Sequence, residues 1–500
     1  MDLGGFPLLT ALVVLPLLGV VALAPIPATD VRILRVTAFG ASLVTFAVSL
    51  LLLAAFVAGE PGFQLTESVE WIPQYGISYA LGVDGVSLFL VLLTTLIVPL
   101  ALLASWEQTD RTKGFLVSML ALQSALIGIF VALDLILFYF FFEVSLVPMY
   151  ALIGIWGGRN RRYAAVKFFL YTLVGGLAML VGILYLYFAG GARSFAYADL
   201  LNVPLSPTAE LLCFLAFAIA FAIKVPLFPL HTWLPDAHTE APTAGSVVLA
   251  AIMLKIGGYG FLRFCLPYFP EATRTAAPYL LALGVVGILY GALVATMQQD
   301  VKKLVAYSSV AHLGFVVLGV FALDNTAASA GVVQMVNHGL STGALFLLVG
   351  FMYDRTHSRQ IAEHSGLLKA APIFGGLFLF TVFSSVALPG LNGFVGEFPI
   401  LLGTFQTTPW AAVLATFGVI FAALYLLWAY QRMFHGPVEG KAAGMPDLNR
   451  REIAVMVPLV ALMLGIGLYP KPIYDRVNPS VEAIVQTVQE EAPVVQEGQR

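Results

Sequence analysis

Charged residues are scarce in this 500-residue chain, since Asp, Glu, Lys and Arg make up only 11% of it, whereas soluble domains carry roughly 25%. Hydrophobic residues account for 60%, and apolar runs recur from residue 7 to about residue 469 with few long polar interruptions. This composition excludes a soluble enzyme and predicts one membrane domain without a sizeable soluble part. The net charge of −3 argues against a nucleic-acid partner.

Cysteine is nearly absent as well. The two that occur, Cys213 and Cys265, lie in apolar runs and form no CxxC or other metal-binding spacing. They therefore argue against a disulfide framework, a zinc site and an iron–sulfur cluster in this chain. The N-terminal residues MDLGGF also lack the basic segment that opens a signal peptide, so we expect the first span to stay in the mature protein.

Apolar windows of roughly 20 residues, the length that crosses a bilayer as a helix, fill most of the chain. They predict an all-α, polytopic membrane protein with about fourteen transmembrane helices, of which the seventh and the twelfth are short. The windows cover residues 7–24, 36–58, 85–106, 114–133, 135–156, 164–189, 209–225, 242–265, 278–297, 303–322, 327–351, 372–388, 410–431 and 453–469.

Basic residues gather in alternate loops, which predicts the orientation because cytoplasmic loops are enriched in Lys and Arg. One side holds Arg32, Arg35, Arg111, Lys113, Arg159, Arg161, Arg162, Lys167, Lys302, Lys303, Arg355, Arg359, Lys369, Arg432, Lys441, Arg450 and Arg451. The other side holds only Arg193, Arg263, Arg274, Lys471, Arg476 and Arg500. We therefore expect both termini to lie outside the cytoplasm.

Two lysines, Lys224 and Lys255, fall in no loop. A lysine at the centre of a bilayer costs about 2.5–3.5 kcal/mol on insertion scales, so we expect both to have partners or water. Four other ionisable residues also lie well inside apolar segments, namely Glu143, His312, His338 and Glu397. Buried carboxylates, lysines and histidines are the groups that a proton relay needs. We predict that these six residues form one.

Each residue also has a purely structural interpretation. Lys224 could snorkel to an interface, Glu143 could serve only to neutralise a lysine, and a single buried histidine is often a satisfied core residue. A relay, by contrast, needs sites whose charge can change. Burial favours the neutral amine of a lysine whereas a nearby carboxylate favours the ammonium, so Glu143 could switch Lys224 between holding and releasing a proton.

Prolines break the two short spans, in "KVPLFP" at Pro226 and in "ALPGLNG" at Pro389. Paired interruptions at matching offsets predict two inverted five-helix repeats, each with a broken helix. The predicted parts are residues 1–113 with the first three helices, 114–265 and 278–434 as two half-channels, and 435–500 with the last helix and a short tail. The charged residues do not repeat at the same offset, so only the architecture is duplicated.

Four long stretches carry a resemblance to a known family: "GVDGVSLFLVLLTT" (82–95), "FEVSLVPMYALIGIWGG" (142–158), "AIKVPLFPLHTWLPDAHTEAPTAGSVVLAAIMLKIGGYG" (222–260) and "DVKKLVAYSSVAHLGF" (300–315). They resemble the antiporter-like membrane subunits of respiratory complex I and of related photosynthetic and Mrp-type complexes. Within this superfamily Glu397, where the L and N subunits and Mrp antiporters usually have lysine, and the short acidic tail are similar to the subunit M (chain 4, or D) branch of NADH-quinone oxidoreductase.

The resemblance implies roles for the predicted residues. Glu143 and Lys224 match an essential ion pair, Lys255 a central lysine, and Glu397 an exit carboxylate, while His312 and His338 connect them. Protons would enter from the cytoplasmic side toward Lys224 and leave past Glu397.

The resemblance also implies a context. The chain would be a subunit of a proton-pumping translocase, without a redox centre or cofactor of its own. NADH or another donor, FMN, iron–sulfur clusters and quinone would belong to partner subunits, and the neighbouring antiporter-like chains would be L and N. The host would be a bacterial inner membrane, with a thylakoid membrane as the alternative.

Three other functions stay open. A monovalent cation/proton antiporter subunit of the Mrp type is the main alternative, although Glu397 in place of lysine argues against it. A haem-bearing oxidoreductase would use His312 and His338 as axial ligands, but no second pair of histidines accompanies them. A structural spacer subunit would not need six ionisable groups inside the membrane.

Overall fold

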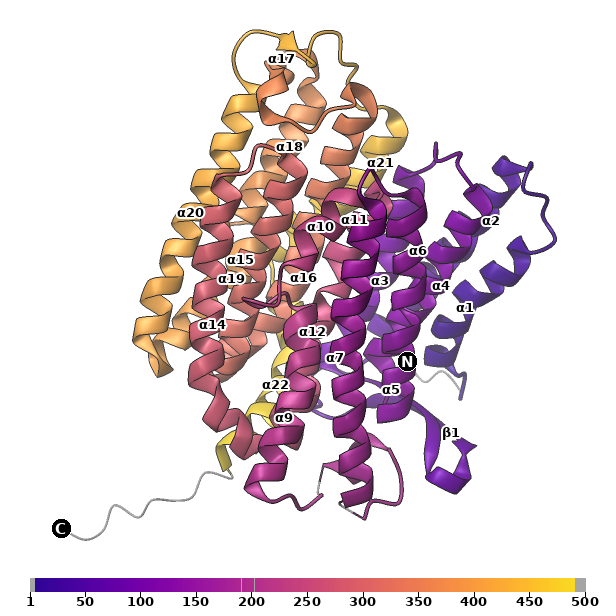
Figure 1. Cartoon of the computed structure of the whole chain (residues 1–500), viewed down its shortest axis with the longest axis vertical. Helices are drawn as coiled ribbons and strands as arrows, with labels where there is room; N and C mark the ends of the chain where they lie inside the picture. Colours follow the sequence, from indigo (N-terminus) through magenta and orange to yellow (C-terminus); the bar gives the residue numbers. More distant parts are fainter. Residues whose placement is uncertain (1–4, 190, 202, 491–500) are drawn as a thin grey trace.

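The computed structural model describes residues 5–189, 191–201 and 203–490, and helices dominate it. Figure 1 shows them standing side by side in one bundle. The N-terminal half contains α1 (Leu8–Leu23), α2 (Val31–Ala55), α3 (Gly85–Ala104), α4 (Thr112–Val131), α5 (Leu135–Val144), α6 (Leu146–Trp156), α7 (Arg161–Ala189), α8 (Tyr197–Leu200), α9 (Pro207–Lys224), α10 (Trp233–Glu240) and α11 (Thr243–Val248).

The remaining helices follow in the order of the chain. They are α12 (Lys255–Gly260), α13 (Leu266–Tyr268), α14 (Pro270–Thr296), α15 (Val301–Phe321), α16 (Asn325–Thr356), α17 (Leu367–Ala370), α18 (Pro372–Ser385), α19 (Asn392–Thr407), α20 (Pro409–Phe434), α21 (Arg450–Leu468) and α22 (Lys471–Glu490). Two π-helical turns, η2 (Leu249–Met253) and η3 (Phe261–Cys265), join α11, α12 and α13, and two 3-10 turns are η1 (Pro73–Tyr75) and η4 (Ile361–Glu363).

Each predicted apolar window coincides with one of these helices or with a consecutive series of them. Of the described helices, 12 are long and apolar enough to cross a membrane, and α1 and α18 are shorter apolar helices. The all-α, multi-pass integral membrane fold is therefore confirmed, whereas the count of fourteen crossings stays a prediction.

The loops that carry the predicted basic residues meet at one end of the bundle, which we call the basic face. There the Lys113 ammonium donates to the Ala24 and Ile26 carbonyls, Val301 N–H donates to the Arg359 carbonyl, and β3 (His364–Ser365) pairs with β4 (Glu439–Gly440). In Figure 1 this is the end that carries α17. The charge asymmetry of the sequence thus corresponds to one contiguous surface.

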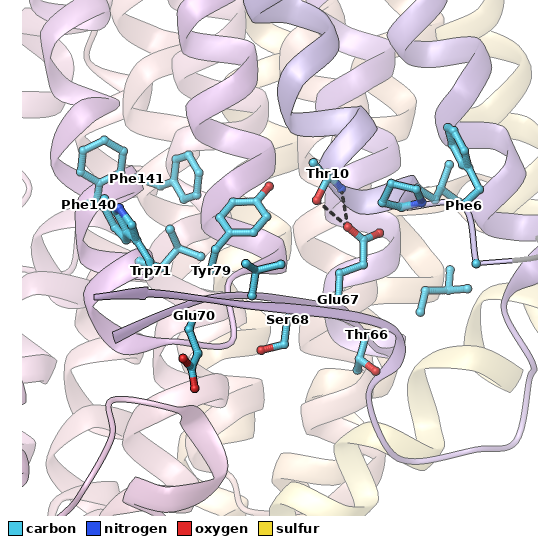
Figure 2. Close-up of a pocket in the computed structure, with 16 residues that line it drawn as sticks. Phe6, Thr10, Thr66, Glu67, Ser68, Glu70, Trp71, Tyr79, Phe140 and Phe141 are labelled. Atoms are coloured by element: carbon cyan, nitrogen blue, oxygen red, sulfur yellow. Dashed lines mark hydrogen bonds between the residues drawn. The ribbon is translucent and has the colours of Figure 1, made fainter. Parts of the chain in front are cut away.

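A β-hairpin marks the opposite end, the hairpin face, where β1 (Gln64–Ile72) runs antiparallel to β2 (Ile77–Val83). The Glu67 carboxylate accepts hydrogen bonds from Leu9 N–H at 2.7 Å and Thr10 N–H at 3.0 Å, so it caps the first turn of α1. Figure 2 shows this contact beside a largely apolar cavity of about 990 Å³, bounded by Trp71 and Phe140. None of the six predicted relay residues lines this cavity.

The tail forms α22, a helix that the sequence did not lead us to expect. Its apolar residues, including Ile473, Val477 and Val481, are buried. The helix lies against α3 and α16, and Gly85 N–H donates to the Ser480 hydroxyl at 3.0 Å. A β-carbon at Gly85 would lie 1.9 Å from the Arg476 carbonyl oxygen, so glycine permits this close approach. α22 therefore fastens the C-terminal segment to the N-terminal third of the chain.

Two helices are interrupted where the prolines predicted. α9 ends at Lys224 and α10 begins at Trp233, while α18 ends at Ser385 and α19 begins at Asn392. In each break the chain loses helical hydrogen bonds, which is tolerated at membrane depth only where the segment is buried in protein or lines a polar route. The two most enclosed spans, residues 243–268 and α16, are buried along the whole of their apolar windows and lie beside these breaks.

Candidate functional site

Four of the six predicted residues form one line through the centre of the bundle. The Lys255 ammonium nitrogen lies 2.6 Å from His338 Nδ1, and His312 Nδ1 lies 2.6 Å from Glu397 Oε1. Between these two pairs the imidazole rings of His338 and His312 have their centroids 6.0 Å apart. Each of the four side chains is at least 95% buried, so the line is shielded from lipid and bulk water.

Lys255 owes its position to an irregular helix. It is the first residue of α12 and follows the π-helical turn η2, and its ammonium donates a second hydrogen bond to the Ala250 carbonyl within that turn. π-turns widen a helix locally and often occur at functional sites. Two partners, a carbonyl and an imidazole, therefore hold this ammonium in a segment that is otherwise apolar.

Glu397 is positioned by the second break. The backbone turns at Ala387, whose φ is +58°, and at Gly390, whose φ is +90°. Asn392, at the start of α19, donates to the Asn337 carbonyl at 3.2 Å, and Asn337 donates to the Asn392 carbonyl at 2.7 Å. This reciprocal pair fixes α19 against α16, so that Glu397 reaches His312.

Two polar side chains complete the surroundings of Glu397 and His312. Gln334 donates from Nε2 to Glu397 Oε1 at 2.8 Å, and the Tyr425 hydroxyl lies 3.4 Å from His312 Nε2. These contacts give the buried carboxyl group of Glu397 hydrogen-bond partners in an otherwise apolar region.

Lys224 and Glu143 have different surroundings. The Lys224 ammonium is 1% exposed and lies 4.7 Å above the Phe142 ring and 5.8 Å from the Phe168 ring. Neither its Nζ nor Glu143 Oε1 has a hydrogen-bond partner within the described part of the chain, and the two groups are more than 4.0 Å apart. The ion pair that the resemblance implied is thus not formed as a direct contact, although the two charges still influence each other.

The first break holds Lys224 at the end of α9. The indole of Trp233, the first residue of α10, donates to the Ile223 carbonyl at 3.0 Å, and this bond connects the two sides of the break. Gly257 packs so close to the end of α9 that a β-carbon there would lie 2.4 Å from Val225 N. Lys224 therefore sits directly against α12, the helix that begins with Lys255.

Several polar residues of this region were missed by reasoning from the sequence. Gln334 and Tyr425 touch the line itself, and His238, on α10, is a further fully buried histidine. Gln334 and His338 are separated by one helical turn, which was a usable signal. Nothing in the local sequence distinguishes Tyr425 from other aromatic residues that face lipid.

The described residues contain no group of three or more His, Cys, Asp or Glu side chains that could hold a metal ion. Cys213 and Cys265 are free and buried. The amines, imidazoles and carboxyl groups of the line are side chains that can exchange protons with one another.

The family model described as NADH:quinone oxidoreductase/Mrp antiporter matches residues 132–422, and the model for the amino terminus of NADH-ubiquinone oxidoreductase chain 4 matches residues 26–129. This chain belongs to that family. Among its curated members, the NADH-quinone oxidoreductase subunit M of Rhodobacter capsulatus is 47% identical over 496 residues, and the alignment covers 96% of each chain.

Two solved structures share the fold of this chain. A chain of respiratory complex I from Thermus thermophilus with bound NADH has a TM-score of 0.89 and 35% identity, over 96% of this chain and 99% of that chain. A chain of the Mrp complex from Dietzia sp. DQ12-45-1b has a TM-score of 0.84 and 20% identity, and the alignment covers 96% of this chain and 99% of that chain. At that identity, the likeness to the Mrp complex shows the fold alone.

Proposed function

We propose that the chain is the proton-translocating subunit M of an NADH-quinone oxidoreductase, and that Glu143, Lys224, Lys255, His338, His312 and Glu397 carry its protons. The observation that supports this most directly is the line from Lys255 to Glu397, in which two hydrogen-bonded pairs of titratable groups face each other through two imidazole rings. The similarity of the chain to subunit M and chain 4 relatives supports the same assignment.

The geometry suggests how a proton would pass along the line. When the Lys255 ammonium donates to His338 Nδ1, that nitrogen must be unprotonated and the ring proton must be on Nε2. Transfer of the proton to Nδ1 would give an imidazolium that can release its other proton from Nε2, the atom without a partner among the described residues. His338 would thus take a proton on one nitrogen and release it from the other.

His312 would repeat this step toward Glu397. A proton that arrives at Nε2, beside the Tyr425 hydroxyl, would allow Nδ1 to pass its proton to Glu397 Oε1. The exit carboxylate would then be neutral and would release its proton toward the hairpin face. Each imidazole would be left with its ring proton on the other nitrogen, so a ring flip or a tautomer exchange must restore His338 and His312 before the next proton passes. Glu143 and Lys224 lie at the other end, where a change in the charge of one favours or disfavours the ammonium of the other.

The proposal includes the wider context. The predicted repeats, residues 114–265 and 278–434, would act as two half-channels between the basic face and the hairpin face. The cytoplasm would lie at the basic face, in a bacterial inner membrane. NADH or another donor, FMN, iron–sulfur clusters and quinone would be bound by other subunits, and chains L and N would be the membrane neighbours.

Proton uptake by the assembled complex in proteoliposomes tests the proposal. We expect Glu143→Gln to remove most proton pumping and most of the coupled quinone reduction, because an amide can neither carry the proton nor influence Lys224 by its charge. Normal turnover with a normal proton gradient in this variant would contradict the relay. Sodium-dependent transport in vesicles that contain only this chain would instead support the Mrp-type alternative.

A further inference from the structure

His238 is a buried titratable residue that the relay proposed above does not use. It lies on α10, just past the first break, and is fully buried. Its ring is stacked on Phe346, with the ring centroids 4.5 Å apart and an angle of 12° between the ring planes. Both ring nitrogens lack a hydrogen-bond partner among the described residues. An unsatisfied buried polar group costs roughly 1–3 kcal/mol, and two such atoms on one ring require an explanation.

Charged groups of α15 and α12 lie within electrostatic range of the His238 ring. Lys302 and Lys255 both act electrostatically on the ring, and His238 in turn acts on His338. Lys302 is on the side of the basic face and Lys255 belongs to the central line. His238 therefore lies on the helix whose end contacts Lys302, and its ring is within electrostatic range of Lys255.

Lys302 belongs to a polar cluster at the basic face, which also contains Arg359 and Asp300. Its ammonium donates to the Ala241 carbonyl, at the end of α10, at 2.6 Å. Beside it Arg359 Nε pairs with Asp300 Oδ2 at 3.3 Å, and another Arg359 nitrogen donates to the Thr239 carbonyl. These contacts surround the last turn of α10 with exchangeable protons.

The exposed fraction of the residues decreases from this polar cluster inward. The Arg359 side chain is 26% exposed, the Lys302 residue 7%, and His238 and Lys255 are each 0% exposed. Lys224 takes no part in this series, since it lies at the far side of the break and packs on Phe142 and Phe168. The series thus approaches Lys255 from the basic face without passing the Glu143 and Lys224 site.

We propose that His238 is a proton carrier in a second inlet, which leads from Lys302 at the basic face directly to Lys255. Neither ring nitrogen has a hydrogen-bond partner among the described residues, so each transfer would pass through an intervening water or follow a movement of the lysine side chain. The Lys302 ammonium would give one proton to the neutral imidazole of His238 and become an amine, which regains its proton from the aqueous side. The His238 imidazolium would then pass a proton to the neutral Lys255 amine and return to its starting form. No bond other than N–H changes, and the charge moves inward by one step each time. This inference rests on the relay proposed above.

The test uses the assembled complex in proteoliposomes, with NADH-driven quinone reduction and proton uptake as readouts. His238→Phe keeps a ring that can stack on Phe346 but removes both nitrogens. We expect it to slow coupled turnover by about tenfold or more, since loss of a positioned acid–base group typically costs 10²–10⁴-fold. His357→Ala, which removes a histidine from a loop of the basic face, is the matched control.

Chemical rescue separates a carrier from a packing residue. His238→Ala leaves room for a small base, so added imidazole should restore part of the turnover, and Lys302→Met should slow turnover as His238→Phe does. If imidazole fails to rescue, or if His238→Phe turns over normally while Lys255→Ala does not, the inlet is overturned and the relay stands. Normal pumping by Lys255→Ala would overturn the relay itself, together with the inlet.

Discussion

The two intramembrane lysines have almost the same burial and very different partners. The Lys255 ammonium has a carbonyl and an imidazole within hydrogen-bond distance, whereas the Lys224 ammonium lies near two aromatic rings and has no hydrogen-bond partner among the described residues. A lysine with fixed hydrogen-bond partners can transfer its proton without a prior change in its surroundings. A lysine without them can change its state only when a neighbouring charge or water changes. The comparison suggests a conducting line, formed by Lys255, His338, His312 and Glu397, and a separate controlling site, formed by Lys224 and Glu143.

Lys255→Ala should have the largest effect, because it removes the only amine of the line and leaves His338 Nδ1 without its donor. We expect coupled quinone reduction and proton uptake to fall by about 100-fold or more, within the range for loss of an acid–base group. The exposed Lys369→Ala is the matched control for loss of a lysine. Substantial pumping by Lys255→Ala would show that protons bypass the line.

Arginine substitutions at the two lysines sharpen the comparison. An arginine keeps the positive charge but does not release its proton in proteins. If both lysines carry protons, Lys224→Arg and Lys255→Arg should each lose most proton uptake, by about tenfold or more. Uptake that survives only in Lys224→Arg would show that Lys224 acts by its charge alone. Native gel electrophoresis of the complex should show that both variants assemble.

The breaks and the six central residues could be predicted from the sequence, because prolines and charges in apolar segments are conspicuous there. The partners could not. Gln334 and Tyr425 meet Glu397 and His312 only through packing of α16 and α20 against α15 and α19, and such contacts leave no local pattern. The same reason explains why the contact of Glu143 and Lys224 that the resemblance implied is not formed: opposite charges in a sequence say nothing of the distance that packed helices enforce.

Gly176→Ala should disturb the controlling site without removing a charge. A β-carbon at residue 176 would lie 1.8 Å from Glu143 Oε1, so the carboxylate must move. Because displacement of a reacting group by about 1 Å can cost 10²-fold, we expect turnover to fall by about tenfold or somewhat more. Gly376→Ala, also within a helix but with nothing within 4 Å of the added atom, should leave turnover unchanged. Equal turnover of the two variants would contradict a role for the position of the Glu143 carboxylate.

Tyr425→Phe should have a smaller effect on the conducting line. Its hydroxyl is 3.4 Å from His312 Nε2, a long hydrogen bond, so its loss should be near the lower end of the usual 0.5–1.5 kcal/mol. We expect a decrease of about two- to threefold in coupled turnover, measured as initial rates of quinone reduction with and without an uncoupler. A loss as large as that of Lys255→Ala would instead make Tyr425 a member of the line.

His357→Ala should have the smallest effect, although it removes a titratable residue. His357 ends α16 at the basic face with φ +50°, and its ring lies beside Tyr353, far along the helix from His338. Because it contacts neither lysine, proton uptake and quinone reduction should stay within the scatter of the wild type. A marked loss would mean that a histidine outside both sites controls the protons, and the division into a conducting line and a controlling site would then fail.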